Sequence, residues 1–290
     1  MKMKLFFSII FLLTALSAYG AFEVFDPDAR SLGMGSALVS VADDANAIFW
    51  NTAGITHIDQ KELAMSYMEL YDLVSYSSLS YVQRMKGSSF GLGVMSSSDT
   101  DGIYHEMELI LCYAKEAINN LNLGANIKYL SSEAYTGDVK LGNGKGISFD
   151  LGGQYHLLDD DVSLGIRLQN LLGYVSYNRK AVMGIASKKY SQSPDLSYGL
   201  GASVDVKRFL PALKDVIVAT ELADGDFHTG IEYTFHNIIS IRSGLRFGNA
   251  LTRAITAGFG IKASALKLDY AYVSSSVGAQ TSQFSVSVSW

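Results

Sequence analysis

Apolar and polar residues alternate along most of the chain. At the C-terminus, every second residue from position 284 to 290 is Phe, Val, Val and Trp, with serines between them. Residues 121–129 likewise alternate leucine, alanine, isoleucine and tyrosine with asparagine, glycine and lysine. A period of two is the period of a β-strand, whose successive side chains point to opposite faces. Each such stretch is therefore predicted to be a strand with one apolar face and one face of polar residues and glycine.

The alternation predicts fourteen strands, an even number, as a closed antiparallel sheet with both termini on one side requires. Breaks after even-numbered strands are tight, whereas those after the third, fifth and seventh strands are longer, the last running from about residue 171 to 195. Short turns on one side and longer loops on the other are typical of bacterial outer-membrane β-barrels. The approximate strand ranges are 62–70, 74–84, 88–96, 105–114, 121–131, 146–157, 161–170, 196–207, 214–222, 227–236, 238–247, 254–263, 265–273 and 282–290.

A soluble barrel or β-sandwich also alternates apolar and polar faces, so periodicity alone leaves that alternative open. The polar faces here carry Gly and Ser with scattered charges, whereas a solvated surface is usually rich in Lys and Glu. Aromatic residues recur at the ends of the apolar faces, where a membrane-interface girdle would lie. They are Tyr67, Tyr113, Tyr129, Phe235, Phe247 and Tyr272. These features favour an all-β, 14-stranded antiparallel transmembrane barrel with its apolar faces toward lipid.

The last strand ends on an aromatic residue of its apolar face. Such a terminal face resembles the signal that the barrel-insertion machinery reads, which makes this machinery an expected partner. The assembly signal is predicted to comprise Phe284, Val286, Val288 and Trp290.

The first twenty residues are predicted to be a signal peptide. Lys2 and Lys4 form a basic start, an apolar run follows from Leu5 to Leu16, and small residues end the stretch at Gly20. Without them the chain has 21 Lys and Arg against 28 Asp and Glu, a net charge of about −7. This balance excludes nucleic acid as an expected partner. Cys112 is the single cysteine, so no disulfide framework is expected, and it is predicted to be a packed residue on a strand.

Residues 29–55, ARSLGMGSALVSVADDANAIFWNTAGI, are the least periodic part of the chain. They contain a Gly-Met-Gly run at 33–35, Ala-Asp-Asp at 42–44 and Trp-Asn-Thr-Ala-Gly at 50–54. This stretch resembles the N-terminal signature of the PorV/PorQ family of outer-membrane proteins, relatives of the FadL long-chain fatty-acid transporters. That signature has Pro where this chain has Thr52. The difference affects the expected conformation of the turn at this position and not the resemblance to the family.

The resemblance implies that an N-terminal plug, residues 21–61, folds inside a barrel formed by residues 62–290. Small residues suit close contact between backbones in a narrow lumen. Asp43-Asp44 is predicted chiefly to cap a short helix, DANAIFW, and Trp50 to wedge the plug against the wall, with direct ligand contact as the alternative for both. The residues assigned to the plug motif are Arg30, Gly33, Gly35, Asp43, Asp44, Asn46, Trp50, Asn51 and Gly54.

Charges inside a half-dry lumen must be paired, because an unpaired buried carboxylate is costly. Arg30 is expected to meet one of three acids, Asp150, Glu221 or Glu232, and the sequence leaves the choice open. The candidate partners of Asp43 and Asp44 are the cations on polar strand faces, Lys128, Arg167, Arg242, Arg246 and Lys262.

Sites with recognisable chemistry are not predicted elsewhere. Asp99-Thr100-Asp101-Gly102 resembles the start of a calcium loop but has Ile110 at the twelfth position, where an EF-hand needs a carboxylate. The glycine-rich stretch at 142–146 lacks the Walker spacing and is interpreted as a flexible loop. The five histidines show no zinc spacing, and no catalytic triad or carboxylate pair can be argued. No metal, cofactor or enzymatic activity is therefore expected.

Two functions remain. The resemblance to PorV and PorQ implies a role accessory to type IX-like protein secretion, through contacts with translocon components or cargo. The alternative is FadL-like transport of a hydrophobic small molecule, such as a long-chain fatty acid, through the plugged lumen and out between strands. FadL-type transporters usually carry more elaborate extracellular loops, so the short loops favour the secretion role. A barrel that only tethers an envelope assembly is a third possibility. Outer-membrane lipid is a partner in every case.

Overall fold

The computed structural model describes residues 21–23, 25–181, 186–248, 253–275 and 280–290. The predicted signal peptide, residues 1–20, lies outside the described residues. Fifteen antiparallel strands form one sheet, and pairing of β6 with β7 closes it into a barrel. The strands are β1 (Glu62–Leu70), β2 (Val74–Met85), β3 (Ser88–Asp99), β4 (Tyr104–Ile118), β5 (Leu121–Thr136), β6 (Val139–Leu157), β7 (Val162–Arg179), β8 (Lys188–Gln192), β9 (Ser197–Asp205), β10 (Val216–Ala223), β11 (Asp226–Phe235), β12 (Ile239–Phe247), β13 (Ala254–Ala263), β14 (Leu266–Ser275) and β15 (Gln280–Ser289).

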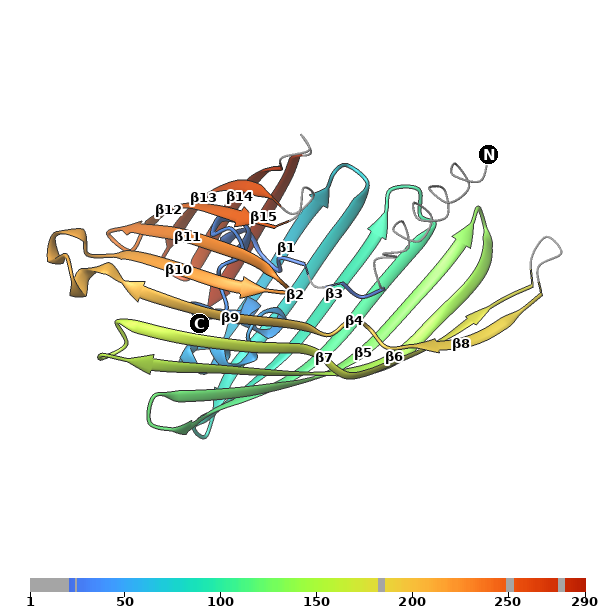
Figure 1. The fold of residues 1–290 in the computed structure, drawn as a ribbon, viewed down its shortest axis with the longest axis horizontal. Helices are drawn as coiled ribbons and strands as arrows, with labels where there is room; N and C mark the ends of the chain where they lie inside the picture. Colours follow the sequence, from blue (N-terminus) through green and yellow to red (C-terminus); the bar gives the residue numbers. More distant parts are fainter. Residues whose placement is uncertain (1–20, 24, 182–185, 249–252, 276–279) are drawn as a thin grey trace, which may run out of the picture.

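Fourteen of these strands follow one another around the barrel, as the alternation predicted (Figure 1). The first and last strands are neighbours, with Glu62 opposite Ser289 and Leu70 opposite Thr281. The junction is secured beyond the strands, where Lys61 and Trp290 exchange both backbone hydrogen bonds at 3.1 and 3.0 Å. The predicted closed 14-stranded fold is therefore confirmed.

The additional strand, β8, continues the position of β9 along β7. β9 pairs with the first half of β7, up to Gln169 opposite Ser197, and β8 pairs with its last part, from Val175 opposite Gln192. The long loop predicted at 171–195 is therefore wrong over most of its length, because β7 runs on to Arg179 and forms a hairpin with β8. This hairpin projects at the right of the barrel in Figure 1.

The loop predicted after the fifth strand is also wrong. β5 and β6 continue to a two-residue turn at 137–138, and the glycine-rich residues 142–146 lie within β6 instead of in a flexible loop. Strand pairing there is carried by the backbone, for example Gly142 opposite Arg179. Polar residues and glycine occupy both faces, so the period-two signal is lost although the hydrogen-bonded ladder continues.

Where the predicted segments match the strands, side chains alternate between an apolar outer face and a lumen face. On β4, Leu111 is 60% exposed and Tyr113 is 45% exposed, whereas Cys112 between them is 5% exposed. The same alternation separates exposed Met65 from buried Ala64 on β1. Monomeric soluble proteins rarely expose such a continuous apolar surface. The outward position of the apolar faces separates this barrel from a soluble one, whose apolar faces point inward.

The predicted assembly signal lies on the outer face of β15. Phe284 and Trp290 are 60% and 55% exposed, and the Trp290 ring lies 6.2 Å from that of Tyr81. Phe284 also packs beside Tyr270 of β14, with ring centroids 4.7 Å apart. Among the described residues, no helix has the length and hydropathy needed to cross a bilayer.

Candidate functional site

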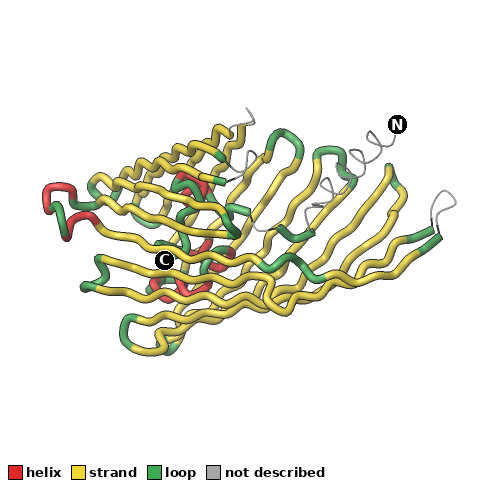
Figure 2. The backbone as a smooth tube through the Cα atoms, in the orientation of Figure 1, coloured by secondary structure: helices red, strands yellow, loops and turns green. Residues whose placement is uncertain are grey.

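The N-terminal segment, defined here as residues 25–58, lies within the ring of strands (Figure 2). It contains the helix α2 (Ala29–Gly33) and two 3₁₀ helices, η1 (Ala45–Phe49) and η2 (Thr52–His57). Each begins at a side chain that accepts a backbone N–H, the usual role of Asp and Asn at a helix start. These caps are Asp28 to Ser31, Asp44 to Asn46 and Asn51 to Ala53. The short helix predicted after Asp43-Asp44 is thus η1, capped by Asp44.

Wall glycines lie where the backbone of the N-terminal segment meets the strands. A side chain at Gly230 would place its Cβ 2.2 Å from the carbonyl oxygen of Met34, and one at Gly244 would lie 2.3 Å from the nitrogen of Gly35. Gly35 itself has φ +65°, which glycine adopts without strain. A Cβ at Gly124 or Gly165 would likewise meet backbone of the segment, and one at Gly152 or Gly201 would meet its side chains. The glycines on the polar strand faces therefore form the seat of the segment.

Replacing Gly230 with alanine should displace the segment from β11. The added methyl group meets backbone rather than a mobile side chain, so we expect a cost of about 1–3 kcal/mol. Hydrogen exchange of the Met34 and Gly35 amides should accelerate. The matched control is Gly153→Ala, because the nearest atoms to a Cβ there belong to the wall and not to the segment: the side chains of Ile166 and Leu123 at 3.1 and 3.5 Å and the Asn122 carbonyl oxygen at 3.9 Å. Equal protection in both variants would show that Gly230 does not seat the segment.

Buried charges join the N-terminal segment to the barrel wall at the end that carries Trp290. Arg30 donates to both oxygens of Glu232 at 3.0 and 2.9 Å and also pairs with Asp43. Glu232 accepts from Arg242, whose other contact is Asp269. The ring closes through Lys267, which lies 3.4 Å from Asp269 and 3.8 Å from Asp44. A bidentate guanidinium pair of this kind fixes orientation as well as charge.

The predicted partners of Asp43 and Asp44 were wrong, since both carboxylates face Arg30 of their own segment and Asp44 also faces Lys267. The chain folds back between α2 and η1. Arg30 therefore lies closer to Asp43 than the nominated cations of the wall do. Among the three acids considered for Arg30, Glu232 is its partner. The other nominated charges pair elsewhere: Lys128 with Asp150 and Glu108, Arg167 with Glu221, Arg242 with Glu232 and Asp269, and Arg246 with Asp26, while Lys262 has no ion pair within the described residues.

Asp28 lies beside this ring with one carboxylate oxygen, Oδ2, that has no hydrogen-bond partner among the described residues. Burial and the nearby charge of Asp44 raise the pKa of Asp28 to about 7. An acid whose pKa is higher in the docked state than in the free chain, where it is 3.8, destabilises docking as the pH rises between these values.

We expect docking of the segment to be tighter at pH 5 than at pH 8. Opening of α2, measured by hydrogen exchange, should be roughly 10- to 100-fold rarer at pH 5 than at pH 8. At pH 5 Asp28 is neutral when docked, and raising the pH toward 7 increasingly favours the free chain, in which this carboxyl is already ionised. Asp28→Asn should remove much of this difference by protecting α2 at pH 8. An unchanged pH dependence in that variant would assign the effect to another group, with Asp44 the nearest candidate because burial raises its pKa too.

Glu221 on β10 binds the middle of the N-terminal segment. Its carboxylate, 1% exposed, accepts the backbone N–H groups of Leu38 and Val39 at 2.9 Å and Trp50 Nε1 at 3.4 Å. Arg167 pairs with the other oxygen at 3.2 Å and lies 4.5 Å from the centre of the Trp50 ring. Trp50 therefore packs against the wall, as predicted for a wedge.

Asn51 and Asn46 of the motif also bond to the wall. Asn51 donates to the carbonyl oxygens of Val39 and Gly153 at 2.6 and 3.1 Å, and Asn46 accepts from Ser80 at 3.2 Å. Gly33 accepts from Thr256 at 2.9 Å, and Gly54 lies so close to Ala42 that a Cβ would be 2.2 Å from its carbonyl oxygen. The motif residues thus act as contacts that hold the segment in place.

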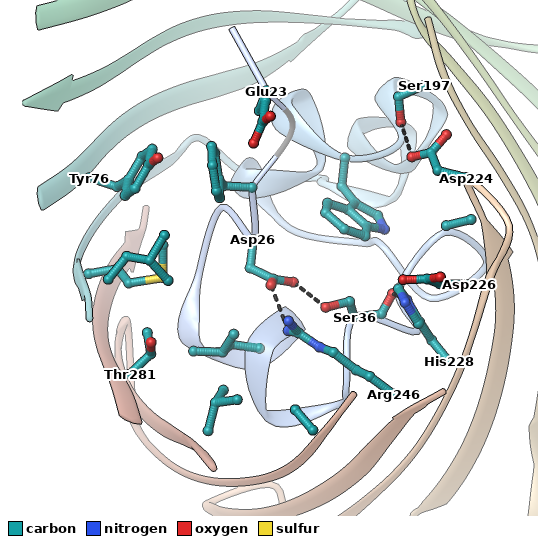
Figure 3. Close-up of a pocket in the computed structure, with 18 of the residues that line it drawn as sticks. Glu23, Asp26, Ser36, Tyr76, Ser197, Asp224, Asp226, His228, Arg246 and Thr281 are labelled. Atoms are coloured by element: carbon teal, nitrogen blue, oxygen red, sulfur yellow. Dashed lines mark hydrogen bonds and ion pairs between the residues drawn. The ribbon is translucent and has the colours of Figure 1, made fainter. Parts of the chain in front are cut away.

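A cavity of about 740 Å³ lies between the N-terminal segment and the barrel end opposite Trp290 (Figure 3). Its floor includes Phe25, Leu32 and Trp50, and its wall includes Met68 and Tyr76. Polar groups enter from the other side, where Asp26 accepts from Ser36 and Arg246, both at 2.6 Å (Figure 3). A concave, mostly apolar space with a few placed polar groups is the usual form of a small-molecule site.

The barrel wall is interrupted beside this cavity. Between Gln169 and Val175, β7 forms no ladder pair with β8 or β9, and Asn170 and Leu172 adopt positive φ values of 60° and 57°. Pairing between β6 and β7 also shifts register here. Pro194 supplies no N–H to the ladder and lies against Gly173. Asn170, Asp195, Leu196 and Ser197, which flank the interruption, also line the cavity.

Several site residues escaped sequence reasoning. Asp26, Lys267, Asp269 and Glu108 complete the lumen ion pairs but were not nominated. Lys267 and Asp269 lie on the polar face of the alternating stretch 266–272, which was the available signal. Within the described part of the chain, no group of three His, Cys, Asp or Glu side chains has metal-site geometry.

Neither a known protein family nor a curated protein matches the sequence. Solved structures do match. The toluene transporter TodX of Pseudomonas putida superposes with a TM-score of 0.65 at 14% identity, covering 93% of this chain and 98% of that chain. The toluene transporter TbuX of Ralstonia pickettii gives 0.61 at 13% identity, with 93% and 98% covered.

A third similar structure, a Pseudomonas aeruginosa FadL homologue, has a TM-score of 0.58 at 12% identity and covers 93% of this chain and 99% of its own. Likeness at these identities shows the fold: the chain has the 14-stranded barrel architecture of FadL-type transporters. The PorV/PorQ assignment has no matching family behind it and stays a prediction.

Proposed function

We propose that this protein is an outer-membrane conduit for hydrophobic small molecules. The observation that carries the proposal is the cavity of about 740 Å³ that lies beside an interruption of the barrel wall. The fold shared with two toluene transporters and a FadL homologue supports it. The sequence alone favoured the secretion-accessory role, with transport as the alternative. The comparisons with solved structures favour transport.

The proposed route begins at the barrel end opposite Trp290 and enters the cavity. The N-terminal segment blocks a straight path along the axis, because the three short helices and their wall contacts fill the lumen below the cavity. An apolar molecule can instead pass sideways between β7 and the β8–β9 region, where the ladder is open and the outer face meets lipid. Such a path spares an apolar molecule contact with the charged ring around Arg30.

The predicted division of the chain fits this proposal. The signal peptide, residues 1–20, would direct export, and the segment within residues 21–61 would act as the plug of a barrel formed by residues 62–290. The secretion-accessory role rests on the resemblance of the motif at residues 29–55 and on the short loops, and each motif residue has a structural contact within the barrel.

The proposal is tested by narrowing the cavity. Ala223 on β10 is buried and lines the cavity, whereas its neighbour Leu222 is 44% exposed on the outer face. In a deletion strain complemented with each variant, Ala223→Trp should lower uptake of labelled hydrophobic probes several-fold, and Leu222→Trp should leave it unchanged. The probe panel should include neutral, anionic and cationic molecules.

Surface-exposed cargo proteins are measured in the same strains. Deletion of the gene should abolish uptake above background and leave the cargo at its normal level. Loss of surface cargo with uptake intact for every probe would reject the conduit and restore the secretion-accessory role.

We also propose that the outer face of β15 is the assembly signal. Deleting Trp290 removes a 55%-exposed ring and the two backbone hydrogen bonds with Lys61 that secure the β1–β15 junction. The fraction of heat-modifiable, folded barrel in membranes should fall severalfold. Ser289→Ala serves as control, because its side chain makes one long contact with Glu62 at 3.4 Å. Normal insertion of the truncated chain would count against the signal.

A further inference from the structure

The cavity lining carries more acidic than basic side chains. Its acids are Glu23, Asp26, Asp195, Asp224 and Asp226, and its only guanidinium groups within the described residues are those of Arg167 and Arg246. Both guanidinium groups are already neutralised, Arg167 by Glu221 and Arg246 by Asp26. The cavity therefore keeps an excess of negative charge.

Three of these acids lack partners. In the part of the chain that the structure describes, the carboxylates of Glu23, Asp195 and Asp226 form no ion pair and accept no hydrogen bond; Asp224, by contrast, accepts from Ser197 and from the Tyr198 backbone at 2.7 and 2.8 Å. Glu23 and Asp226 are half-buried, and Asp195 is exposed.

Negative charge is crowded around Glu23. Burial, followed by repulsion from Glu106 and Asp195, raises the pKa of Glu23 to about 7. Glu106 accepts the Phe22 backbone N–H, with N···O distances of 3.1 and 3.2 Å, and a hydrogen bond from the Tyr104 hydroxyl, but it forms no ion pair within the described residues. A cation placed among these carboxylates would relieve their repulsion, whereas an anion would add to it.

Aromatic rings line the same space. Phe22, Phe25, Trp50, Tyr71 and Tyr76 all border the cavity, and the rings of Phe25 and Tyr76 lie 4.2 Å apart beside Glu23. Aromatic faces attract ammonium groups and provide apolar contact for a hydrocarbon group. The combination of aromatic walls and unpaired carboxylates is the chemistry that recognises amines.

We propose that this cavity selects organic cations, namely amines or quaternary ammonium ions that carry an aromatic or alkyl group, over neutral and anionic molecules of the same size. The inference rests on the proposed conduit function and names its substrate class. Arg246 is the group that an anionic ligand would seek, and its Nε atom lacks a partner among the described residues. Its charge is nevertheless engaged by Asp26 at 2.6 Å, and no further cation balances Glu23, Asp195 and Asp226 in the lining.

The test is equilibrium binding of three matched probes to the full chain in non-ionic detergent: 2-phenylethylamine, 2-phenylethanol and phenylacetate. We expect the amine to bind at least roughly ten-fold more tightly than the other two at pH 8, since Coulomb attraction is strengthened in a partly buried site. Its affinity should rise from pH 6 to pH 8 as Glu23 ionises, while binding of the alcohol stays constant.

Variants assign the preference to the cavity. Glu23→Gln combined with Asp195→Asn should reduce the preference for the amine to less than about three-fold, because two unpaired charges are lost. Asp138→Asn, an exposed acid in the β5–β6 turn, removes a charge outside the cavity and should retain the preference.

The failures are distinguishable. Tighter or equal binding of the alcohol or of phenylacetate would overturn the cation inference and leave the conduit standing. If the Glu23/Asp195 double variant kept its preference for the amine, the assignment of that preference to this cavity would be wrong. Absence of binding for all three probes, together with unchanged uptake in the Ala223→Trp strain, would reject both the inference and the conduit.

Discussion

Deleting residues 29–55 should convert the closed barrel into an open channel. The strand pairs, including the β1–β15 junction, do not involve these residues, so the barrel should still assemble. Barrels of eight strands are filled by their own side chains, whereas those of 16–18 strands leave an aqueous channel. Fourteen strands lined by glycine and serine should leave a pore once the N-terminal segment is gone. We expect single-channel conductance in planar bilayers to rise at least about ten-fold.

The full chain, reconstituted in the same bilayers, provides the comparison. Heat-modifiability of both proteins on gels verifies that the deleted chain is folded. A folded deletion variant with the conductance of the full chain would mean that these residues do not close the lumen.

Replacing Arg30 with methionine should release the N-terminal segment without unfolding the barrel. Arg30 is 8% exposed in its side chain, and its loss leaves Asp43 without its partner and Glu232 with Arg242 alone. Breaking a buried ion pair by removing one partner typically costs about 3–5 kcal/mol. Opening of α2, followed by hydrogen exchange, should therefore become about two to four orders of magnitude more frequent.

Two further variants control this experiment. Arg30→Met combined with Glu232→Gln should recover part of the protection, because it removes one of the carboxylates that outnumber the remaining cations of the ring, while Arg242 keeps Asp269. Arg84→Met breaks a pair that is 42% and 81% exposed, with Asp59, and should cost no more than about 1 kcal/mol. Similar exchange in Arg30→Met and Arg84→Met would show that the charged ring does not hold the segment.

The barrel was predictable from sequence because hydrocarbon imposes a strict alternation on the strands that cross it. The fourteen predicted segments match observed strands, and β1 and β13 match to the residue. The prediction failed in the parts of β5 to β8 where polar residues and glycine occupy both faces of the strand. In these parts the strands are held by backbone hydrogen bonds alone. Such pairing does not require alternating apolar and polar residues, so it cannot be predicted from the sequence pattern.

The lumen was less predictable than the wall. The motif at residues 29–55 indicated which residues hold the N-terminal segment, but charge pairing depends on how that segment folds back on itself. Arg30 reaches Asp43, thirteen residues further along the chain, because the N-terminal segment turns back on itself, a proximity that no spacing in sequence encodes. The sequence shows that the polar strand faces are rich in glycine. It does not show which residues of the N-terminal segment they contact, such as Met34 at Gly230 and Val39 at Gly165.

Function was the least predictable feature. The motif led to the secretion family, whereas the cavity and the broken ladder beside it arise from residues far apart in sequence, such as Phe25, Asn170 and Thr281. Loop length favoured the secretion role, yet much of the expected loop at 171–195 is strand in β7 and β8, and the comparisons favour the transport alternative.

The seating of the N-terminal segment inside a barrel whose apolar face meets lipid is tested most directly with the single cysteine. Cys112 points into the lumen and packs in the same buried cluster as Ile48 of η1, while Leu111 next to it faces outward. The measurement is the reaction rate of Cys112 with a small water-soluble thiol reagent in proteoliposomes. We predict a rate at least about a hundred-fold higher after deletion of residues 29–55, because a buried thiol then faces water. Leu111→Cys in a Cys112→Ser background should stay unreactive in both proteins. Equal rates for Cys112 with and without the segment, or rapid reaction at position 111, would contradict the account.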